Sequence, residues 1–268
     1  MPGIFVVIPT YNEADNLPLM AAELWALNIG GLVAVVVDDN SPDGTGLIAD
    51  ELAAQQPGSL FALHRPRKEG LGAAYICGFQ WALQHGADVV FQMDCDFSHS
   101  PEHIPQMLYE LRDCDVVVGS RYVGGGQIDE RWGTGRYLLS WWANAVYSRF
   151  LLNMKVKDAT AGFKCWRADV LRSINLERIS SFGYSFQFEM AYIAEKLGYC
   201  IKEIPIYFED RRIGHSKLTI PIKIEAALRT WLILWQYRQL TPEQRLPLLE
   251  KPVAAGATGE RGEHSAHS

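Results

Sequence analysis

Short apolar runs rich in β-branched residues recur along the first 121 residues, and polar, helix-like segments separate them. The runs lie at 4–8, 33–37, 60–63, 89–94 and 115–118. Runs of this length and composition are typical of strands buried on both faces. The intervening helices are expected at 15–27, 45–54, 71–84 and from 101 onward. This alternation predicts an α/β fold with a Rossmann-like, mostly parallel sheet and helices on both faces.

The second half of the chain predicts longer helices and two further strands. The strands are expected at 163–166 and 201–208, and the helices at 136–152, 184–197 and 220–240. The last helix is amphipathic and basic, which suits either packing on the core or a membrane interface. The glycine-rich segment 124–135 suits either a mobile loop or a plain surface connection. We expect one domain over 1–240 and a disordered tail over 241–268.

Composition narrows the function classes. The chain has 268 residues, 48% of them apolar, so it can bury a full core. Its formal net charge of −6 disfavours general affinity for nucleic acid. Five cysteines without a C-x-x-C pair indicate reduced thiols rather than a disulfide frame or a zinc site. Because neither a signal peptide nor a transmembrane run is evident, we expect a cytoplasmic protein.

Asp94 and Asp96 follow directly after the apolar run that begins at Val89. On an extended backbone, residues two apart point to the same side, so both carboxylates can face one cation. Oxygen-only ligation suits Mg²⁺ or Mn²⁺, and Mg²⁺ typically combines one or two carboxylates with substrate phosphates. The alternative is an ordinary solvated turn, because a D-x-D pattern also arises by chance.

Other chemically capable residues also gather where predicted strands end. These groups are 9–13, 38–39, 94–96 and Arg121. In open α/β sheets, ligands bind outside the carboxyl ends of the strands, so the clustering predicts an active site there. A further loop, 210–217, carries Arg211, Arg212 and Lys217. Such a loop can clamp phosphate, although a solvated charge run is the alternative.

Several motifs, taken together and in order, resemble family 2 glycosyltransferases with the GT-A fold. The first three are V-I-P-T-Y-N-E at 7–13, D-D-N-S-P-D-G-T at 38–45 and D-C-D at 94–96. Four more narrow the resemblance to the polyprenol-monophosphate (dolichol-phosphate) mannose synthases: G-S-R-Y at 119–122, D-A-T-A-G-F at 158–163, F-Q-F-E-M at 186–190 and D-R-R-I-G-H-S-K-L at 210–218. The resemblance implies inverting transfer of mannose from GDP-mannose to a polyprenyl phosphate.

The resemblance also implies roles for individual residues. The nucleoside would be held by Pro9, Tyr11, Glu13, Val37 and Asp39. The metal and diphosphate would be met by Asp94, Cys95 and Asp96, with the metal on the two aspartates. The donor or acceptor phosphates would be contacted by Arg121, Arg211 and Lys217, and Arg136 would lie near the acceptor. Asp96 and the three arginines are the candidate catalytic residues. Because the acceptor phosphate is already an anion, no general base is needed.

Two departures from the family pattern matter. Ser98 stands where some relatives carry a glutamine that helps to bind metal, and the C-terminal transmembrane helices of some relatives are missing. Peripheral contact with the cytoplasmic face of a membrane would then come from the 220–240 helix, the 124–135 loop or a separate membrane subunit. The alternatives are a UDP-glucose-dependent polyprenyl-phosphate glucosyltransferase, a processive polysaccharide synthase and a non-enzymatic nucleotide-binding or scaffold protein.

Overall fold

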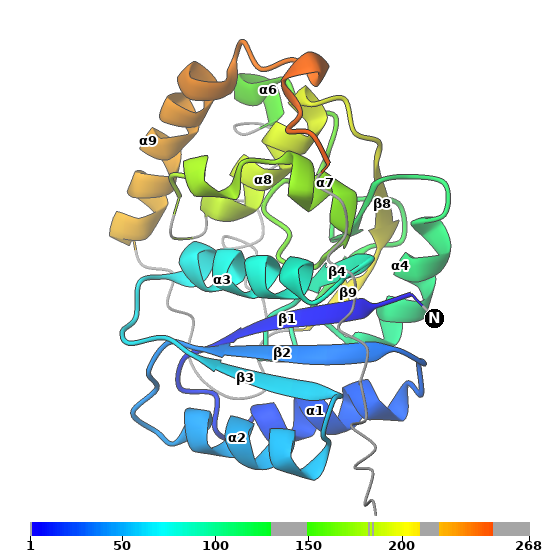
Figure 1. Cartoon of the computed structure of the whole chain (residues 1–268). Helices are drawn as coiled ribbons and strands as arrows, with labels where there is room; N and C mark the ends of the chain where they lie inside the picture. The colour runs from blue at the N-terminus through cyan, green and yellow to red at the C-terminus, as the bar shows by residue number, and fades with distance from the viewer. Residues whose placement is uncertain (1, 130–148, 182, 184, 210–219, 249–268) are drawn as a thin grey trace, which may run out of the picture.

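The computed structural model describes residues 2–129, 149–181, 183, 185–209 and 220–248. Its centre is a seven-stranded sheet in the order β3-β2-β1-β4-β7-β5-β8 (Figure 1). The strands are β1 Ile4–Thr10, β2 Leu32–Asp38, β3 Leu60–His64, β4 Val89–Gln92, β5 Val116–Ser120, β7 Lys164–Arg167 and β8 Ile201–Pro205. β7 is antiparallel to both of its neighbours, and the other pairings in this sheet are parallel. The prediction of a mostly parallel sheet is confirmed.

Helices cover both faces of the sheet, and Figure 1 shows α1 and α2 on the side opposite α3, α7 and α8. The longer helices are α1 Leu17–Ala26, α2 Thr45–Gln55, α3 Leu71–Gln84, α8 Ser185–Lys196 and α9 Ile220–Tyr237. The shorter ones are α4 Ile104–Glu110, α6 Arg149–Leu152 and α7 Ala168–Ser173. The bounds of α3 match the prediction, and those of α1, α2, α8 and α9 differ from it by at most three residues at either end.

Alternate residues of each strand face different helix layers, because the side-chain period of a strand is two. In β1, Ile4, Val6 and Ile8 join the core with α1, while Phe5 and Val7 join the core with α3. Two apolar cores therefore enclose the sheet, which explains why its strands read as unbroken apolar runs.

The predicted strand at 201–208 is interrupted. β8 ends at Pro205, and a separate strand, β9 Tyr207–Phe208, pairs with β6 Gln127–Ile128 in a second, two-stranded sheet. The start of the glycine-rich segment at 124–135 is therefore ordered. Gly126 allows this path, because a Cβ there would lie 2.7 Å from the carbonyl oxygen of Arg121. Residues 130–135 lie outside the described part of the chain.

The folded region extends past the predicted boundary at Leu240. The Leu246 amide donates to the Ser173 carbonyl at 2.9 Å. Arg245 Nε donates to the Leu197 carbonyl at 2.8 Å, and its guanidinium lies 4.0 Å from the centre of the Tyr199 ring. Residues 241–248, which were expected to belong to a disordered tail, are therefore part of the described structure, and residues 249–268 lie outside it.

Two further observations concern the whole chain and its described helices. All five cysteines lie in the described part of the chain, and none forms a disulfide there. Among the helices that the structure describes, none combines the length and apolarity needed to cross a membrane.

Candidate active site

The candidate site lies where the order of strands in the sheet reverses. β1 has β2 on one side and β4 on the other, and β3 continues beyond β2. Parallel strands that diverge in this way leave a crevice outside their carboxyl ends, which is the usual ligand site of such sheets. The loops that leave β1, β2 and β4 each hold a non-glycine residue with positive φ: Asn12 at 59°, Asn40 at 57° and Phe97 at 64°. Strained backbone of this kind is concentrated at functional sites.

Asp94 is held in place by two neighbours after the end of β4. The Tyr75 hydroxyl on α3 donates to Asp94 Oδ1 at 2.7 Å. The Asp94 amide donates to His99 Nδ1 at 3.1 Å, so the ring fixes the backbone as well. The described residues place no hydrogen bond on Asp94 Oδ2, which lies 4.0 Å from His99 Nδ1.

Asp96 is more buried than Asp94, with 5% of its surface exposed. Its Oδ1 accepts hydrogen bonds from the Ser98 amide at 3.1 Å and from the Ser98 hydroxyl at 2.6 Å. Ser98 therefore orients Asp96. Between the aspartates, Cys95 is buried, and burial raises the pKa of its thiol well above the usual value. The thiol stays protonated, so Cys95 would contribute to a ligand site through its backbone.

The chemistry of these groups fits a hard divalent cation. Within the described residues, no cluster of three or more His, Cys, Asp or Glu side chains forms a complete protein cage for a metal. Mg²⁺ needs only one or two protein carboxylates where substrate phosphates and water complete its coordination. The pair Asp94 and Asp96 is therefore sufficient as the protein's share of such a site.

The residues expected to hold a nucleoside line the ends of β1 and β2, with different degrees of access. Tyr11 is half-buried, and Lys68 Nζ lies 3.6 Å from the centre of its ring. The Glu13 amide donates to Thr45 Oγ1 at 2.9 Å. Pro9 is also half-buried. Val37 is fully buried in the core, so only its backbone is available to a ligand.

Asp39 is a buried carboxylate at the end of β2, and Arg65 forms an ion pair with it. Burial raises the pKa of Asp39, and the charge of Arg65 opposes that rise. The backbone amides of Glu69 and Gly70 also donate to this carboxylate. Arg65 and Asp39 therefore hold each other in place on the β2 side of the crevice.

Arg121, at the end of β5, is clamped by the loop that precedes β7. Its Nε and Nη2 donate to the two oxygens of Asp158 at 2.8 and 2.7 Å, and Nη2 also donates to Thr160 Oγ1 at 2.9 Å. Asp158 is completely buried. This bidentate pair fixes the direction of the guanidinium and occupies one edge of it, so a phosphate would meet the other edge.

Lys164 is a further charged residue that the sequence reasoning did not identify. It is fully buried on β7, with Nζ donating to the Ala161 carbonyl and, at 3.1 Å, to Gln187 Oε1. Burial lowers the pKa of Lys164 to about 7, although Asp158 and Asp94 oppose the shift. The D-A-T-A-G-F motif ends one residue before Lys164, so the motif was a usable signal. Tyr75 and His99 were also missed.

Three of the predicted phosphate-binding cations, Arg136, Arg211 and Lys217, lie outside the described residues. Their predicted roles therefore remain predictions. Of the four predicted cations, Arg121 is the one within the described residues, where its charge and those of Asp94 and Asp96 all act on His99.

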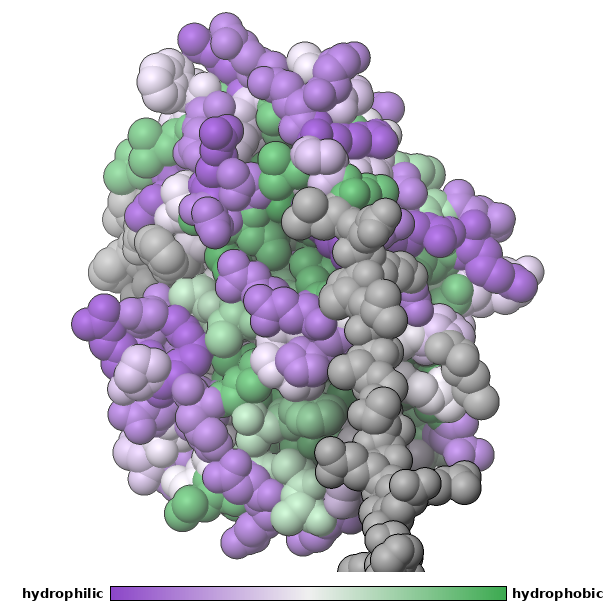
Figure 2. Space-filling view, in the orientation of Figure 1, coloured by the Kyte–Doolittle hydropathy of each residue, from purple (hydrophilic) through white to green (hydrophobic). Residues whose placement is uncertain are grey.

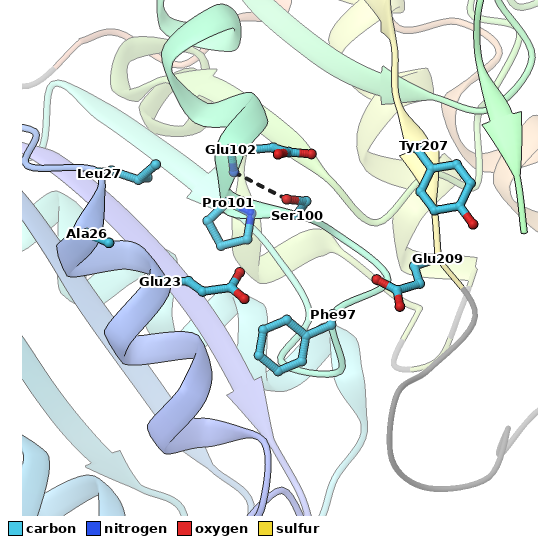
Figure 3. A pocket seen from close by; sticks show the side chains of 9 residues that line it. All are labelled: Glu23, Ala26, Leu27, Phe97, Ser100, Pro101, Glu102, Tyr207 and Glu209. Atoms are coloured by element: carbon cyan, nitrogen blue, oxygen red, sulfur yellow. Dashed lines mark hydrogen bonds between the residues drawn. The ribbon is translucent and has the colours of Figure 1, made fainter.

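A cavity of about 340 Å³ adjoins the Asp94–Ser98 loop on its α1 side. Figure 3 shows Glu23 from α1 and Glu209 after β9 directed toward it, with the Phe97 ring between them. Phe97 follows Asp96 directly in the chain, so the cavity borders the loop that carries the candidate metal pair. Its acidic lining distinguishes it from the phosphate-binding region expected at the strand ends.

Comparison with known proteins gives the relationships of the chain. Residues 5–174 match the family described as glycosyl transferase family 2. An undecaprenyl-phosphate mannosyltransferase from Micrococcus luteus is 45% identical over 225 residues, which cover 84% of this chain and 91% of that protein. A polyprenol monophosphomannose synthase from Mycolicibacterium smegmatis is 44% identical over 215 residues, covering 80% of each chain.

Solved structures agree on the fold. Glucosyl-3-phosphoglycerate synthase from Mycobacterium tuberculosis, with Mn²⁺, UDP and phosphoglyceric acid, superposes with a TM-score of 0.62 at 17% identity, covering 89% of this chain and 79% of that one. Mannosyl-3-phosphoglycerate synthase from Rubrobacter xylanophilus gives 0.61 at 19% identity, covering 92% and 77%. The sheet order and these likenesses agree with the GT-A type of glycosyltransferase fold. The chain belongs to glycosyl transferase family 2.

Proposed function

We propose that this protein transfers mannose from GDP-mannose to a polyprenyl phosphate, with inversion at the sugar carbon, and releases GDP. The observation that carries the proposal is the pair Asp94 and Asp96 at the carboxyl end of β4, each anchored through Oδ1. Relatives at 44–45% identity whose names specify polyprenyl-phosphate mannosyl transfer support the choice of substrates.

The role of the aspartates is to hold a divalent cation against the donor diphosphate. When bound, Mg²⁺ or Mn²⁺ would stabilise the negative charge that develops on the leaving nucleoside diphosphate. Arg121, fixed by Asp158, supplies a positive charge with a defined direction near the same place. Pro9, Tyr11, Glu13 and Asp39 supply the proposed nucleoside contacts.

The acceptor needs alignment rather than activation. A phosphate monoester has a second pKa of about 6, so near neutral pH it is already a competent nucleophile. His99, the histidine nearest to the aspartates, is buried, and burial lowers its pKa. We assign it no role as a base. Arg136, Arg211 and Lys217 are the proposed partners of the acceptor phosphate.

A donor competition assay tests the function. Purified protein with Mn²⁺ and polyprenyl phosphate would receive radiolabelled GDP-mannose, UDP-glucose or UDP-N-acetylglucosamine, and the organic phase would be counted. Label from GDP-mannose that unlabelled UDP-glucose does not suppress is the expected result. Label from UDP-glucose alone would contradict the proposed mannosyl transfer and support glucosyl transfer instead.

For the lipid acceptor, we propose that α9 rests on the membrane interface. Leu228, Trp231, Leu232 and Trp235 are all exposed, with Trp235 at 70%. Figure 2 shows apolar surface at the edge of the molecule where Figure 1 draws α9. Thr230, Ile233 and Tyr237 on the other side are buried, so the helix already uses one face for packing. Exposed tryptophans with a nearby cation, here Arg238, suit the headgroup region.

Vesicle binding tests this surface. Replacing Trp231 and Trp235 together by alanine should reduce sedimentation with vesicles of anionic phospholipid by about 10-fold or more, because each indole buries a large apolar area. Leu47→Ala is the matched control, since Leu47 is 72% exposed on α2, away from this face. Equal sedimentation of the folded double variant and the control would remove α9 as the anchor.

A further inference from the structure

We propose that Tyr75 and His99 are positioning residues for Asp94: together they fix which oxygen of this carboxylate is offered to the divalent cation. The inference deepens the proposed function and rests on it, since it concerns the same metal site. Neither residue was assigned a role from the sequence motifs.

Tyr75 controls the side chain of Asp94. It is fully buried on α3, and its ring is stacked on Phe186 with an interplanar angle of 5° and a centroid distance of 5.8 Å. The hydroxyl can therefore move little, and it donates to Asp94 Oδ1 at 2.7 Å. Burial, reinforced by the charge of Asp94, raises the pKa of Tyr75 well above its usual value, so the phenol keeps the proton that it donates.

His99 controls the backbone of the same residue. Its Nδ1 accepts from the Asp94 amide at 3.1 Å, which requires the neutral tautomer with the proton on Nε2. The ring is stacked on Phe163 at 5.4 Å and meets the Phe208 ring edge-on at 5.9 Å. Gly162 leaves room for it, because a Cβ there would lie 2.7 Å from His99 Cε1. These contacts hold the imidazole in one orientation.

Both contacts fix the orientation of the Asp94 carboxylate. With the backbone held by His99 and Oδ1 held by Tyr75, the carboxylate cannot rotate freely, and Oδ2 stays without a hydrogen bond from the described residues. A ligand oxygen that is already oriented loses less entropy when it binds a cation. Partners of this kind behind a metal ligand typically change metal affinity by 10- to 100-fold when they are removed.

Direct binding of Mn²⁺, measured by the loss of the free-ion electron paramagnetic resonance signal with GDP present, tests the proposal without relying on turnover. Tyr75→Phe should raise the dissociation constant for Mn²⁺ by about 10-fold. Tyr237→Phe is the matched control, because its buried hydroxyl also donates to a carboxylate, Glu189 Oε1 at 2.8 Å, away from the aspartates. That variant should lose stability while its affinity for Mn²⁺ stays unchanged.

A second pair of variants gives an independent test at His99. Asparagine can place an acceptor where Nδ1 lies, whereas glutamine places one nearer Nε2. His99→Asn should therefore bind Mn²⁺ about as well as the parent protein, and His99→Gln should bind it about 10-fold more weakly. If Tyr75→Phe does not fold, this pair carries the test.

Two results would overturn the inference in distinguishable ways. Parent-like affinity for Mn²⁺ in both Tyr75→Phe and His99→Gln, together with loss of binding in Asp96→Asn, would remove the positioning role and leave the metal site intact. Parent-like affinity in Asp94→Asn and Asp96→Asn would remove the metal site itself, and the positioning role with it.

Discussion

Two acidic strand ends of this protein look alike in the sequence and differ in the structure. β2 ends in Asp38–Asp39, and β4 is followed by Asp94–Cys95–Asp96. Asp38 is saturated by the protein, since Oδ1 accepts from Thr10 Oγ1 at 3.1 Å and Oδ2 accepts from the Ser41 amide at 3.0 Å. Asp94 has a single donor on Oδ1 and no hydrogen bond from the described residues on Oδ2.

The difference shows what separates a structural aspartate from a candidate ligand. A carboxylate whose two oxygens both accept hydrogen bonds from the protein is already stabilised, so it gains little by binding a cation. A carboxylate with one oriented oxygen that accepts no hydrogen bond can bind a cation through that oxygen. Asp38 has protein donors on both oxygens, whereas Asp94 keeps one oxygen without a hydrogen bond from the described residues, so Asp94 is the better candidate ligand of the two.

The largest effect expected from this comparison is at Asp96. Asp96→Asn should lower mannosyl transfer by at least about 1000-fold, or about 4 kcal/mol in the barrier, because the ligand charge is lost. The amide oxygen can still accept from Ser98, so urea denaturation should show nearly parent-like stability. EDTA should abolish activity, and Mn²⁺ or Mg²⁺ should restore it. Asp113→Asn, at an exposed position, is the control, and full activity in EDTA would contradict the prediction.

The second effect concerns stability at the other strand end. Asp38→Ala should lower the free energy of unfolding by about 2–3 kcal/mol, because the groups of Thr10 and Ser41 that donate to this buried carboxylate would lose their acceptor. Its affinity for Mn²⁺ should stay within about twofold of the parent value. Asp50→Ala, whose carboxylate is 57% exposed, should cost less than about 0.5 kcal/mol. Loss of Mn²⁺ binding in Asp38→Ala would erase the distinction between the two strand ends.

A third effect follows from the buried cation beside β4. The pKa of Lys164 is about 7 in the folded protein and 10.5 for the ordinary side chain. Between these values the unfolded chain binds the proton and the folded protein does not, so this residue makes stability rise with pH. Relative to Lys164→Met, parent stability should increase by at most about 1.4 kcal/mol per pH unit above pH 7. Urea denaturation at pH 7 and pH 9 measures it, and parallel pH profiles would contradict it.

The smallest effects come from two serines that have the same role at the two strand ends. The Ser41 hydroxyl donates to Asp38 at 2.5 Å, and the Ser98 hydroxyl donates to Asp96 at 2.6 Å. Ser41→Ala and Ser98→Ala should each cost about 1 kcal/mol of stability. Only Ser98→Ala should also weaken Mn²⁺ binding severalfold in the resonance assay. An equal change in both variants would show that the effect is general rather than local.

The α/β class, the positions of the first five strands along the chain and the place of the candidate metal pair after β4 could be predicted from the sequence. Apolar runs of strand length identify buried strands through side-chain periodicity, and parallel strands bring their carboxyl ends to one edge. The bounds of α3 were predicted correctly because Leu71–Gln84 has a continuous helical pattern between two glycine-containing turns.

Tertiary structure alone decided which side chains meet at that edge. Tyr75 reaches Asp94 across 19 positions, Arg121 meets Asp158 across 37, and Gln92 meets Gln187 across 95. The sequence also did not predict that β7 pairs antiparallel with β4, and this pairing places Lys164 in the core beside Gln92. Local periodicity contains no information about such long-range partners. They arise from the packing of α3, β4 and β7, which fixes the direction of each carboxylate and the burial of each charge.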